Sequence, residues 1–227
     1  MPDRRLHTFD EAIDGIESGM TIIVGGFGAA GVPLHLLAAI RARGLTDLTV
    51  ISNNAGFGGP DLTSWIEARM VRRVICSYPR TSPACIAQWK AGAIEIEVVP
   101  QGTLAERLRA AGAGLGGFFT PVGAGTLLAE GKEQRMLGGR LQVLEVPLHA
   151  DVALLRAEQA DPFGNLTYRK TARNFSPIMA TAARLVVVEC AHLVPLGSLD
   201  PEHIITPGIF VDRVIQAPPG DFAGDPA

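Results

Sequence analysis

Cysteine is scarce in this 227-residue sequence, which contains only Cys76, Cys85 and Cys190. None of them belongs to a C-x-x-C pair, and no pair of histidines lies nearby. This spacing excludes a disulfide framework and a zinc site, so we expect no bound metal and a reducing, cytoplasmic location. Cys76 is expected to be a buried small side chain, since free cysteine is among the most buried residue types.

An excess of charge of either sign is also missing, and so is a long hydrophobic run. The formal net charge is −3 and the isoelectric point is about 6.0, with lysines and arginines scattered along the chain. No basic face is available for a phosphate backbone, which argues against nucleic acid as a partner. Residues 20–40 form the one long uncharged stretch, and glycines and a proline interrupt it, so no membrane segment is expected.

Glycine and proline are abundant, with 26 and 16 residues. Hydrophobic residues make up 47% of the chain and aromatic residues 6%. This balance is typical of a buried parallel sheet whose strands are joined by tight loops. The length fits one large domain, so we expect residues 1–227 to form a single unit with a frayed tail at 218–227.

Hydrophobic periodicity predicts alternating strands and helices. Thr8 and Glu11 have the spacing of a capping box, which predicts a helix over 8–18. Strands are predicted at 20–24, 48–52, 73–77, 94–99, 152–156 and 185–189, and helices from 33, at 82–91, at 104–111 and after 174. Two short apolar runs around Gly138-Gly139 predict a hairpin over 135–144. The predicted fold class is α/β, with an open, largely parallel sheet and crossover helices.

A glycine-rich loop follows the predicted strand 20–24. Gly26-Phe-Gly28-Ala-Ala-Gly31 is a G-x-G-x-x-G sequence between a strand and a helix, the context of a dinucleotide-binding turn. Such a turn also needs an acidic residue for the ribose at the end of the next strand, where this chain has Ser52-Asn53-Asn54. The sequence therefore argues against an NAD enzyme. Tight turns alone explain the glycines as well, but two polar strand ends at one sheet edge favour a small-molecule site.

A longer motif covers the same loop. Residues 22–33, Ile-Ile-Val-Gly-Gly-Phe-Gly-Ala-Ala-Gly-Val-Pro, resemble the signature of family I CoA-transferases, a hydrophobic triplet followed by GGF-x3-G-x-P. Ser18 stands where the family has an acidic residue or asparagine. Further similar segments cover 52–56, 100–107, 118–126, 168–175 and 206–212. Over residues 5–215 the chain resembles the A subunit of 3-oxoacid or 3-oxoadipate CoA-transferases, which implies the three-layer fold of that family.

The resemblance implies ping-pong chemistry, in which a glutamate attacks an acyl-CoA, forms an anhydride and becomes a glutamyl-CoA thioester. In the family this glutamate lies in a S-E-N-G-like segment of the B subunit, and this chain has no such segment. A hetero-oligomer is therefore implied, in which the B subunit carries the catalytic glutamate and this chain has no catalytic residue. The CoA thioester is a substrate, and no separate cofactor is implied. Glu189 is the best internal candidate, although strand-end carboxylates are more commonly solvated or salt-bridged.

The resemblance also implies a binding site for the acid substrate. It places Asn53, Asn54 and Gln101 in the acid pocket, where amides donate to oxygens without acting as nucleophiles. Alternatively, the two asparagines cap a turn and Gln101 starts a helix. Backbone N–H groups of the glycine loop and of the following helix are expected to receive a carboxylate or thioester oxygen, and the acyl-CoA loop comprises Gly25, Gly26, Phe27, Gly28 and Gly31.

Several roles stay open. Arg169, Lys170 and Arg173 suit CoA phosphates, the subunit interface or solvent equally well. The donor is succinyl-CoA or a similar thioester, and the acceptor a 3-oxoacid such as 3-oxoadipate or acetoacetate. An acetate or glutaconate CoA-transferase subunit is the alternative, and outside the class a sugar-phosphate-binding isomerase or regulator of related fold. Surface or core roles are expected for the isolated histidines, which are His35, His149, His192 and His203.

Overall fold

The computed structural model describes residues 2–219, which form one large and one small sheet. Nine strands of this range make up the large sheet, namely β1 (Arg5–Leu6), β2 (Thr21–Val24), β3 (Leu48–Asn54), β4 (Val71–Tyr78), β5 (Glu95–Val98), β9 (Ala150–Ala160), β10 (Leu166–Thr167), β11 (Ala183–Leu193) and β12 (Arg213–Gln216). The small sheet consists of β6 (Phe118–Thr120), β7 (Gln134–Leu137) and β8 (Arg140–Glu145).

Helices connect most of these strands. The α-helices are α1 (Phe9–Ala12), α2 (Leu34–Arg43), α3 (Leu62–Glu67), α4 (Pro83–Lys90), α5 (Gln101–Gly112) and α6 (Ser176–Thr181). Short 3₁₀ turns lie at η1 (Pro79–Thr81), η2 (Leu127–Ala129), η3 (Lys170–Arg173), η4 (Pro201–His203) and η5 (Gly208–Phe210). In the part of the chain that the structure describes, no helix has the length and apolar character needed to cross a bilayer.

The large sheet is open and almost entirely parallel. Its strands follow the order β1-β12-β11-β9-β2-β3-β4-β5, and β10 pairs with the end of β9. Every neighbouring pair along this path is parallel, and only the β9–β10 pair is antiparallel. Because the path ends in β1 and β5, the sheet does not close into a barrel. The predicted fold class is confirmed.

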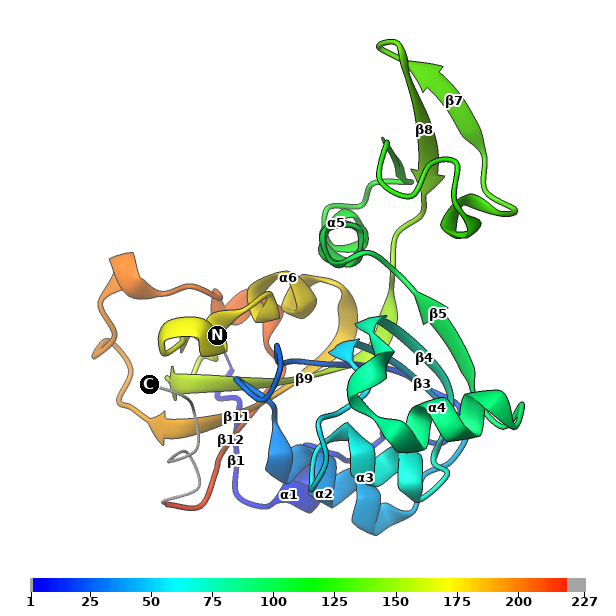
Figure 1. Ribbon diagram of the computed structural model, residues 1–227. Coiled ribbons are helices and arrows are strands. Elements are labelled where there is room, and N and C mark those ends of the chain that lie inside the picture. Colours follow the sequence, from blue (N-terminus) through cyan, green and yellow to red (C-terminus); the bar gives the residue numbers. More distant parts are fainter. Residues whose placement is uncertain (1, 220–227) are drawn as a thin grey trace.

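Two layers of helices cover the sheet (Figure 1), because alternate residues of a strand face opposite sides. Ile22, Val50 and Val74 pack in the cluster that includes residues of α1, α2 and α3, whereas Ile23 and Ile51 pack in the cluster that includes residues of α5 and α6. In Figure 1 the first set of helices lies below the sheet and α5 and α6 above it. The result is a three-layer arrangement.

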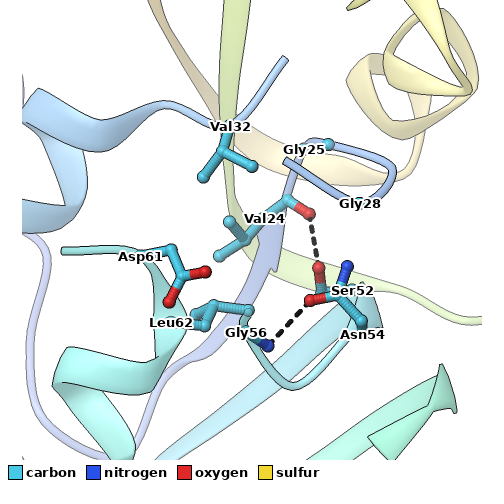
Figure 2. Close-up of a pocket in the computed structure, with 10 residues that line it drawn as sticks. Val24, Gly25, Gly28, Val32, Ser52, Asn54, Gly56, Asp61 and Leu62 are labelled. Atoms are coloured by element: carbon cyan, nitrogen blue, oxygen red, sulfur yellow. Dashed lines mark hydrogen bonds between the residues drawn. The ribbon is translucent and has the colours of Figure 1, made fainter. Parts of the chain in front are cut away.

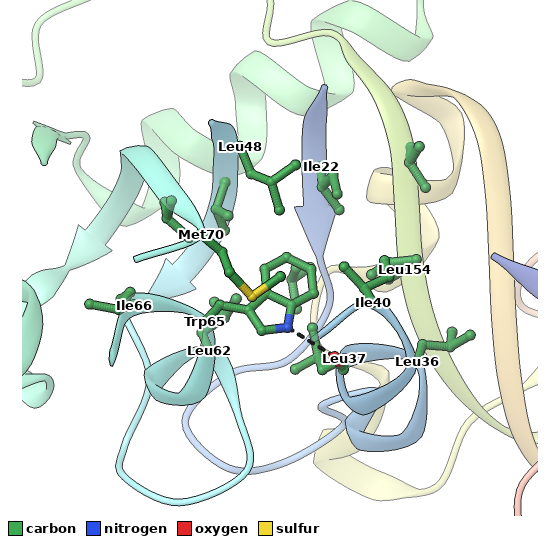
Figure 3. Packing of buried hydrophobic residues seen from close by; sticks show 14 of the residues in the cluster. Ile22, Leu36, Leu37, Ile40, Leu48, Leu62, Trp65, Ile66, Met70 and Leu154 are labelled. Carbon is green, nitrogen blue, oxygen red and sulfur yellow. Dashed lines mark hydrogen bonds between the residues drawn. The ribbon is translucent and has the colours of Figure 1, made fainter. Parts of the chain in front are cut away.

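Trp65 of α3 ties two helices of the lower layer together (Figure 3). Its side chain is fully buried, and its Nε1 donates to the carbonyl oxygen of Leu37 in α2 over 2.9 Å. Met70 and Ile40 pack in the same cluster. Burial of the indole supplies apolar area, and the hydrogen bond satisfies its one polar atom. This contact holds α2 and α3 together on one face of the sheet.

The small sheet lies between α5 and β9 in the sequence and projects from the main body (Figure 1). The predicted hairpin at 135–144 is confirmed as β7 and β8. Arg107 of α5 links this sheet to the body, since its Nε donates to Val146 O over 2.7 Å and its Nη1 pairs with Glu97 Oε1 over 2.7 Å. Glu145 of β8 pairs with Lys132 Nζ over 2.7 Å and lies 3.7 Å from Arg107 Nε.

The predicted boundaries need correction in several places. The capping box of Thr8 and Glu11 is present, but the helix predicted over 8–18 is wrong, since α1 ends at Ala12 and Gly15 adopts a φ of 74°. β3 extends to Asn54, so Asn53 and Asn54 lie within the strand and not after it. The short elements α3, β1, β6, β10 and β12 were absent from the predicted set, and residues 220–227 of the predicted frayed tail lie outside the described range.

Candidate active site

Three polar segments meet at the carboxyl edge of the large sheet. The glycine loop, residues 25–31, follows β2, Asn53 and Asn54 end β3, and Gln101 begins α5 shortly after β5. All these strands are parallel, so their carboxyl ends lie on one edge. Ligands of open α/β sheets bind outside this edge. The fold therefore places the predicted site residues where a small-molecule site is expected.

The predicted amides form a connected chain of hydrogen bonds. Asn53 Nδ2 donates to Gln101 Oε1 over 2.6 Å, and Asn53 Oδ1 accepts from Asn54 Nδ2 over 3.2 Å. The same Asn53 oxygen accepts from the backbone N–H of Gly28 over 3.4 Å, which joins the chain to the glycine loop. Because Asn53 occupies Gln101 Oε1, the Gln101 amide group is oriented with its Nε2 available, and this nitrogen has no hydrogen-bond partner within residues 2–219.

Asn53 and Asn54 have different partners apart from the 3.2 Å hydrogen bond between them. Asn53 reaches Gln101 at the start of α5, on the upper side of the sheet. Asn54 Oδ1 instead accepts from Gly56 N over 2.7 Å, which caps the turn after the strand. The sequence left a binding role and a turn-capping role open for both asparagines. Within the chain, Asn54 therefore caps the turn after β3, whereas Asn53 bonds to Gln101.

The inner side of the glycine loop is closed (Figure 2). The space there measures about 10 Å³, and its lining includes Gly25, Gly26, Gly28, Asn54 and Asp61. A cavity of that size holds a single water molecule at most. Gly26 has a φ of 121°, and a Cβ there would lie 2.7 Å from Val32 Cγ2. Its lack of a side chain thus serves packing of the loop against Val32.

Most donors expected from the loop and the following helix are already engaged. Gly25 N donates to Leu154 O over 2.9 Å and Phe27 N to Ala30 O over 3.0 Å. At the start of α2, the N–H groups of residues 35 and 36 both donate to Glu189 Oε2 over 3.0 Å. The expectation that these groups receive a substrate oxygen is therefore wrong for the start of α2 in this structure.

Glu189 is a structural residue in this chain. It lies in the middle of β11, its side chain is 1% exposed, and it compensates the unsatisfied N–H groups at the start of α2. His35 Nδ1 lies 3.5 Å from Glu189 Oε1. Arg156 occupies the paired position of β9, and its Nη1 donates to Val32 O over 3.5 Å. A carboxylate held in this way has no open path to a thioester carbonyl. The placement of Glu189 at a strand end was also wrong.

The outer side of the loop opens into a groove of about 870 Å³. The groove lies between the glycine loop, the start of α5 and η3, and its lining includes Phe27, Gln101, Lys170 and Arg173. Gly31 holds the loop against η3, since a Cβ at this position would lie 2.6 Å from Ala172 O. Of the two sides of the glycine loop, this groove alone has room for a substrate acid.

The cysteines offer no alternative nucleophile. Burial raises the pKa of the Cys76 and Cys190 thiols to about 12 and that of Cys85 to about 11, so all three stay protonated at neutral pH. Each is buried, as expected for Cys76. His203 Nδ1 lies 2.8 Å from Asp200 Oδ2 on the surface. Among residues 2–219, no group of three histidine, cysteine, aspartate or glutamate side chains is placed to hold a metal ion.

The sequence matches a known family over nearly its whole length. A family model described as coenzyme A transferase covers residues 6–217. The chain belongs to the coenzyme A transferase family. The resemblance first found at residues 22–33 is thereby confirmed, and the dinucleotide enzyme and the sugar-phosphate isomerase or regulator are set aside.

Two similar curated proteins are named as subunits, and a solved structure shares the fold. The A subunit of the 3-oxoadipate CoA-transferase from Pseudomonas putida is 55% identical over 217 residues, which cover 95% of this chain and 94% of the relative. The alpha subunit of the acetate CoA-transferase from Escherichia coli (strain K12) is 44% identical, with 93% and 96% covered. The apoenzyme of an acyl-CoA transferase from Escherichia coli O157:H7 shares the fold, with a TM-score of 0.86 at 20% identity. The match covers 95% of this chain and 47% of that chain.

Proposed function

We propose that this chain is the A subunit of a 3-oxoacid CoA-transferase, which moves CoA from succinyl-CoA or a similar donor to a 3-oxoacid such as 3-oxoadipate or acetoacetate. Family membership and the name of the Pseudomonas putida relative support this assignment. A B subunit supplies the catalytic glutamate, and the active enzyme is a hetero-oligomer.

The observation that carries the proposal is a groove with donors and cations but no available nucleophile. Gln101 Nε2, Lys170 and Arg173 line it or face it, and its lining includes no aspartate or glutamate. Glu189, the best internal candidate, is bound to the start of α2. The sequence contains no S-E-N-G segment. A groove of this kind binds an acid, and the covalent chemistry requires a carboxylate from another chain.

The chemistry proceeds in balanced steps. The partner's glutamate carboxylate attacks the thioester carbonyl of the donor, CoA leaves as a thiolate, and an acyl-glutamyl anhydride forms. The thiolate then attacks the glutamyl carbonyl, which releases the donor acid and leaves a glutamyl-CoA thioester. The acceptor carboxylate then attacks the glutamyl-CoA thioester, which releases the CoA thiolate and forms a second anhydride. The thiolate attacks the acceptor carbonyl of this anhydride, which gives the new acyl-CoA and frees the glutamate. Each acid arrives or leaves as a carboxylate, and Gln101 Nε2 donates a hydrogen bond to it, with Asn53 holding the amide in position.

Exposed aromatic side chains beside the site fit coverage by a partner. Phe27 in the glycine loop is 52% exposed and Phe57 after β3 is 50% exposed. Phe27 lines the groove itself, and a Cβ at Gly28 would lie 3.9 Å from the Phe57 ring. Large apolar side chains at a site rim are characteristic of interaction surfaces. The B subunit has to reach this rim to bring its glutamate to the groove.

The test is reconstitution. This chain and a partner chain that contains S-E-N-G are purified separately and mixed, and CoA transfer from succinyl-CoA to 3-oxoadipate and to acetoacetate is followed by chromatography of the CoA esters. We expect transfer by the mixture and none by either chain alone. A complex that forms but transfers CoA to neither acid contradicts the proposed function.

An acetate CoA-transferase subunit is the second candidate, because the Escherichia coli relative carries that name. The same reconstituted complex distinguishes the two. If kcat/KM is highest with acetate as the acceptor, the chain is an acetate CoA-transferase subunit. The assignment as a CoA-transferase then stands, and the 3-oxoacid substrate is wrong.

A further inference from the structure

The groove beside the glycine loop has a positively charged end. An acid with a single carboxylate, bound at Gln101, leaves these charges without a partner. Lys170 and Arg173 line this end, and no aspartate or glutamate belongs to the lining. Both side chains are exposed, and neither forms an ion pair or a side-chain hydrogen bond within residues 2–219. The adjoining cavity of about 510 Å³ is lined by the same two cations and by one carboxylate, Asp200, so the cations outnumber the carboxylates of the two linings. The end of the groove therefore attracts an anion.

The turn that carries these cations is held in a strained conformation. Lys170 has a φ of 47° and Asn174 a φ of 35°, values that residues with a side chain rarely adopt. Asn174 fixes the turn, because its Nδ2 donates to Ala172 O over 2.9 Å and to Ala30 O over 3.4 Å. Its Oδ1 accepts from both the N–H and the hydroxyl of Ser176 over 3.0 Å. Strained backbone persists where the surrounding contacts over-determine it, and it is concentrated at ligand sites.

This arrangement fixes the turn that carries the two cations relative to the Gln101 amide. Asn174 joins the turn to the glycine loop at Ala30, and Asn53 joins the same loop, at Gly28, to Gln101. Gln101 and the two cations therefore line one groove. Hydrogen bonds connect the segments on both sides of this groove to the glycine loop. A substrate with a carboxylate at Gln101 and a second charge further along its chain meets complementary groups at both places.

We propose that Lys170 and Arg173 receive the second carboxylate of dicarboxylic substrates, so that this chain selects dicarboxylic over monocarboxylic 3-oxoacids. The inference rests on the proposed function. A 3-oxoadipate molecule and a succinyl group each have a free carboxylate remote from the reacting carbonyl, whereas acetoacetate has none. A guanidinium and an ammonium supply the charge-assisted hydrogen bonds that such a carboxylate requires.

The experiment compares substrates with and without this second carboxylate in the reconstituted complex. In ping-pong kinetics, kcat/KM for one substrate reports only the half-reaction in which it takes part. Succinyl-CoA and 3-oxoadipate form one set, and acetoacetyl-CoA and acetoacetate form the other. Arg173→Gln and Lys170→Gln are the test variants, and Arg173→Lys retains the charge. Arg169→Gln is the matched control, because Arg169 is an exposed neighbouring cation outside the groove lining.

We expect Arg173→Gln to lower kcat/KM for succinyl-CoA and for 3-oxoadipate by about 10- to 150-fold, the usual range for a lost hydrogen bond to a charged group. The values for acetoacetyl-CoA and acetoacetate stay within about twofold of wild type, and Arg169→Gln changes neither set. Arg173→Lys recovers part of the loss. Melting temperatures and elution volumes of the complexes verify folding and assembly.

An equal loss with acetoacetyl-CoA and succinyl-CoA overturns the inference, because the anion is then a CoA phosphate common to both. Loss of complex formation in Arg173→Gln overturns it as well, since the cation then belongs to the subunit interface. A wild-type complex that uses acetoacetate but not 3-oxoadipate overturns the inference and leaves the transferase proposal intact. A wild-type complex without activity toward either acid contradicts the proposed function itself.

Discussion

Asn53 and Gln101 are 48 positions apart in the sequence, yet Asn53 Nδ2 donates to Gln101 Oε1 over 2.6 Å at the carboxyl edge of the sheet. The bond fixes which end of the Gln101 amide faces the groove. Asn54, the neighbour of Asn53 in β3, has no bond to Gln101; its Oδ1 accepts from Gly56 N over 2.7 Å and its Nδ2 donates to Asn53 Oδ1 over 3.2 Å. Adjacent asparagines in one strand therefore have separable roles, and substitutions can distinguish them.

Gln101→Ala is expected to reduce turnover without unfolding the chain. Loss of a hydrogen bond to the acid costs roughly 1–3 kcal/mol, which corresponds to about a 5- to 150-fold lower kcat/KM if the bond persists in the transition state. Steady-state kinetics of the reconstituted complex measure this loss. Asn54→Ala is the comparison, and we expect it to lower the melting temperature with kcat/KM for the acid close to wild type. The reverse pattern in the two variants assigns acid binding to Asn54.

Glu189→Gln tests the structural role of the buried carboxylate. The neutral amide retains an acceptor but removes the charge at the start of α2, at a cost of roughly 1–3 kcal/mol. For a chain of this length that cost lowers the melting temperature by about 2–4 °C per kcal/mol. Glu17→Gln, at an exposed glutamate whose carboxylate forms no hydrogen bond within residues 2–219, is expected to leave it unchanged. A stable Glu189→Gln variant whose complex is inactive contradicts this role and returns Glu189 to the chemistry.

Gly28 and Gly31 form a matched pair for the glycine loop. Their φ angles are 63° and 74°, so alanine meets similar backbone strain at both, about 1–2 kcal/mol. At Gly28 the added Cβ meets only the Phe57 ring at 3.9 Å, whereas at Gly31 it lies 2.6 Å from Ala172 O. We expect Gly31→Ala to lower the melting temperature well beyond Gly28→Ala, because the loop and η3 have to separate. Equal decreases in melting temperature for the two variants contradict this expectation. They show that the glycine loop and η3 accommodate the added methyl group without a loss of stability.

Glu97 makes stability depend on pH in the acid range. Burial raises its pKa, but the hydrogen bond and charge of Arg107 and the charge and hydrogen bond of Arg73 outweigh burial, so the pKa lies below its ordinary value of 4.5. The folded state thus binds this proton more weakly than the unfolded state. The stabilisation is present above about pH 4.5 and is lost as the pH falls through the folded pKa.

The measurement is the melting temperature of wild type and Glu97→Gln from pH 7 downward. We expect the difference between them to be largest at neutral pH and to narrow below about pH 4.5. Glu95→Gln is the control, since that side chain is 75% exposed and lies 3.8 Å from Arg73. If the difference in melting temperature between wild type and Glu97→Gln stays constant across this pH range, the ion pairs of Glu97 are not the source of that difference.

The sequence predicts the fold class well because the signals are local and repeated. The apolar runs of β2, β3 and β11 and the capping box at Thr8 depend on neighbouring residues, and each appears in the structure. The short strands β1 and β12 have weak patterns of their own, and they exist because each completes the hydrogen bonds of a partner far along the chain. Long-range pairing of this kind is not encoded in local periodicity.

For the site, the residue types are predictable but their partners are not. The motif at 52–56 singles out both asparagines, yet their different partners depend on where the strand ends and on the contact with Gln101. Glu189 looks like a free strand-end carboxylate until its bonds to the start of α2 are known, over 150 positions away. The role of Asn174 in holding η3 against the glycine loop depends on the same kind of remote contact.

The central claim is that the nucleophile arrives on another chain, and intact mass measurement of the two separated chains tests it most directly. The reconstituted complex is incubated with succinyl-CoA, quenched in acid and separated into its two chains. We expect the mass of a CoA thioester on the partner chain alone, with this chain at its unmodified mass. A CoA adduct on this chain, mapped by peptide digestion to Glu189 or any other carboxylate, contradicts the account.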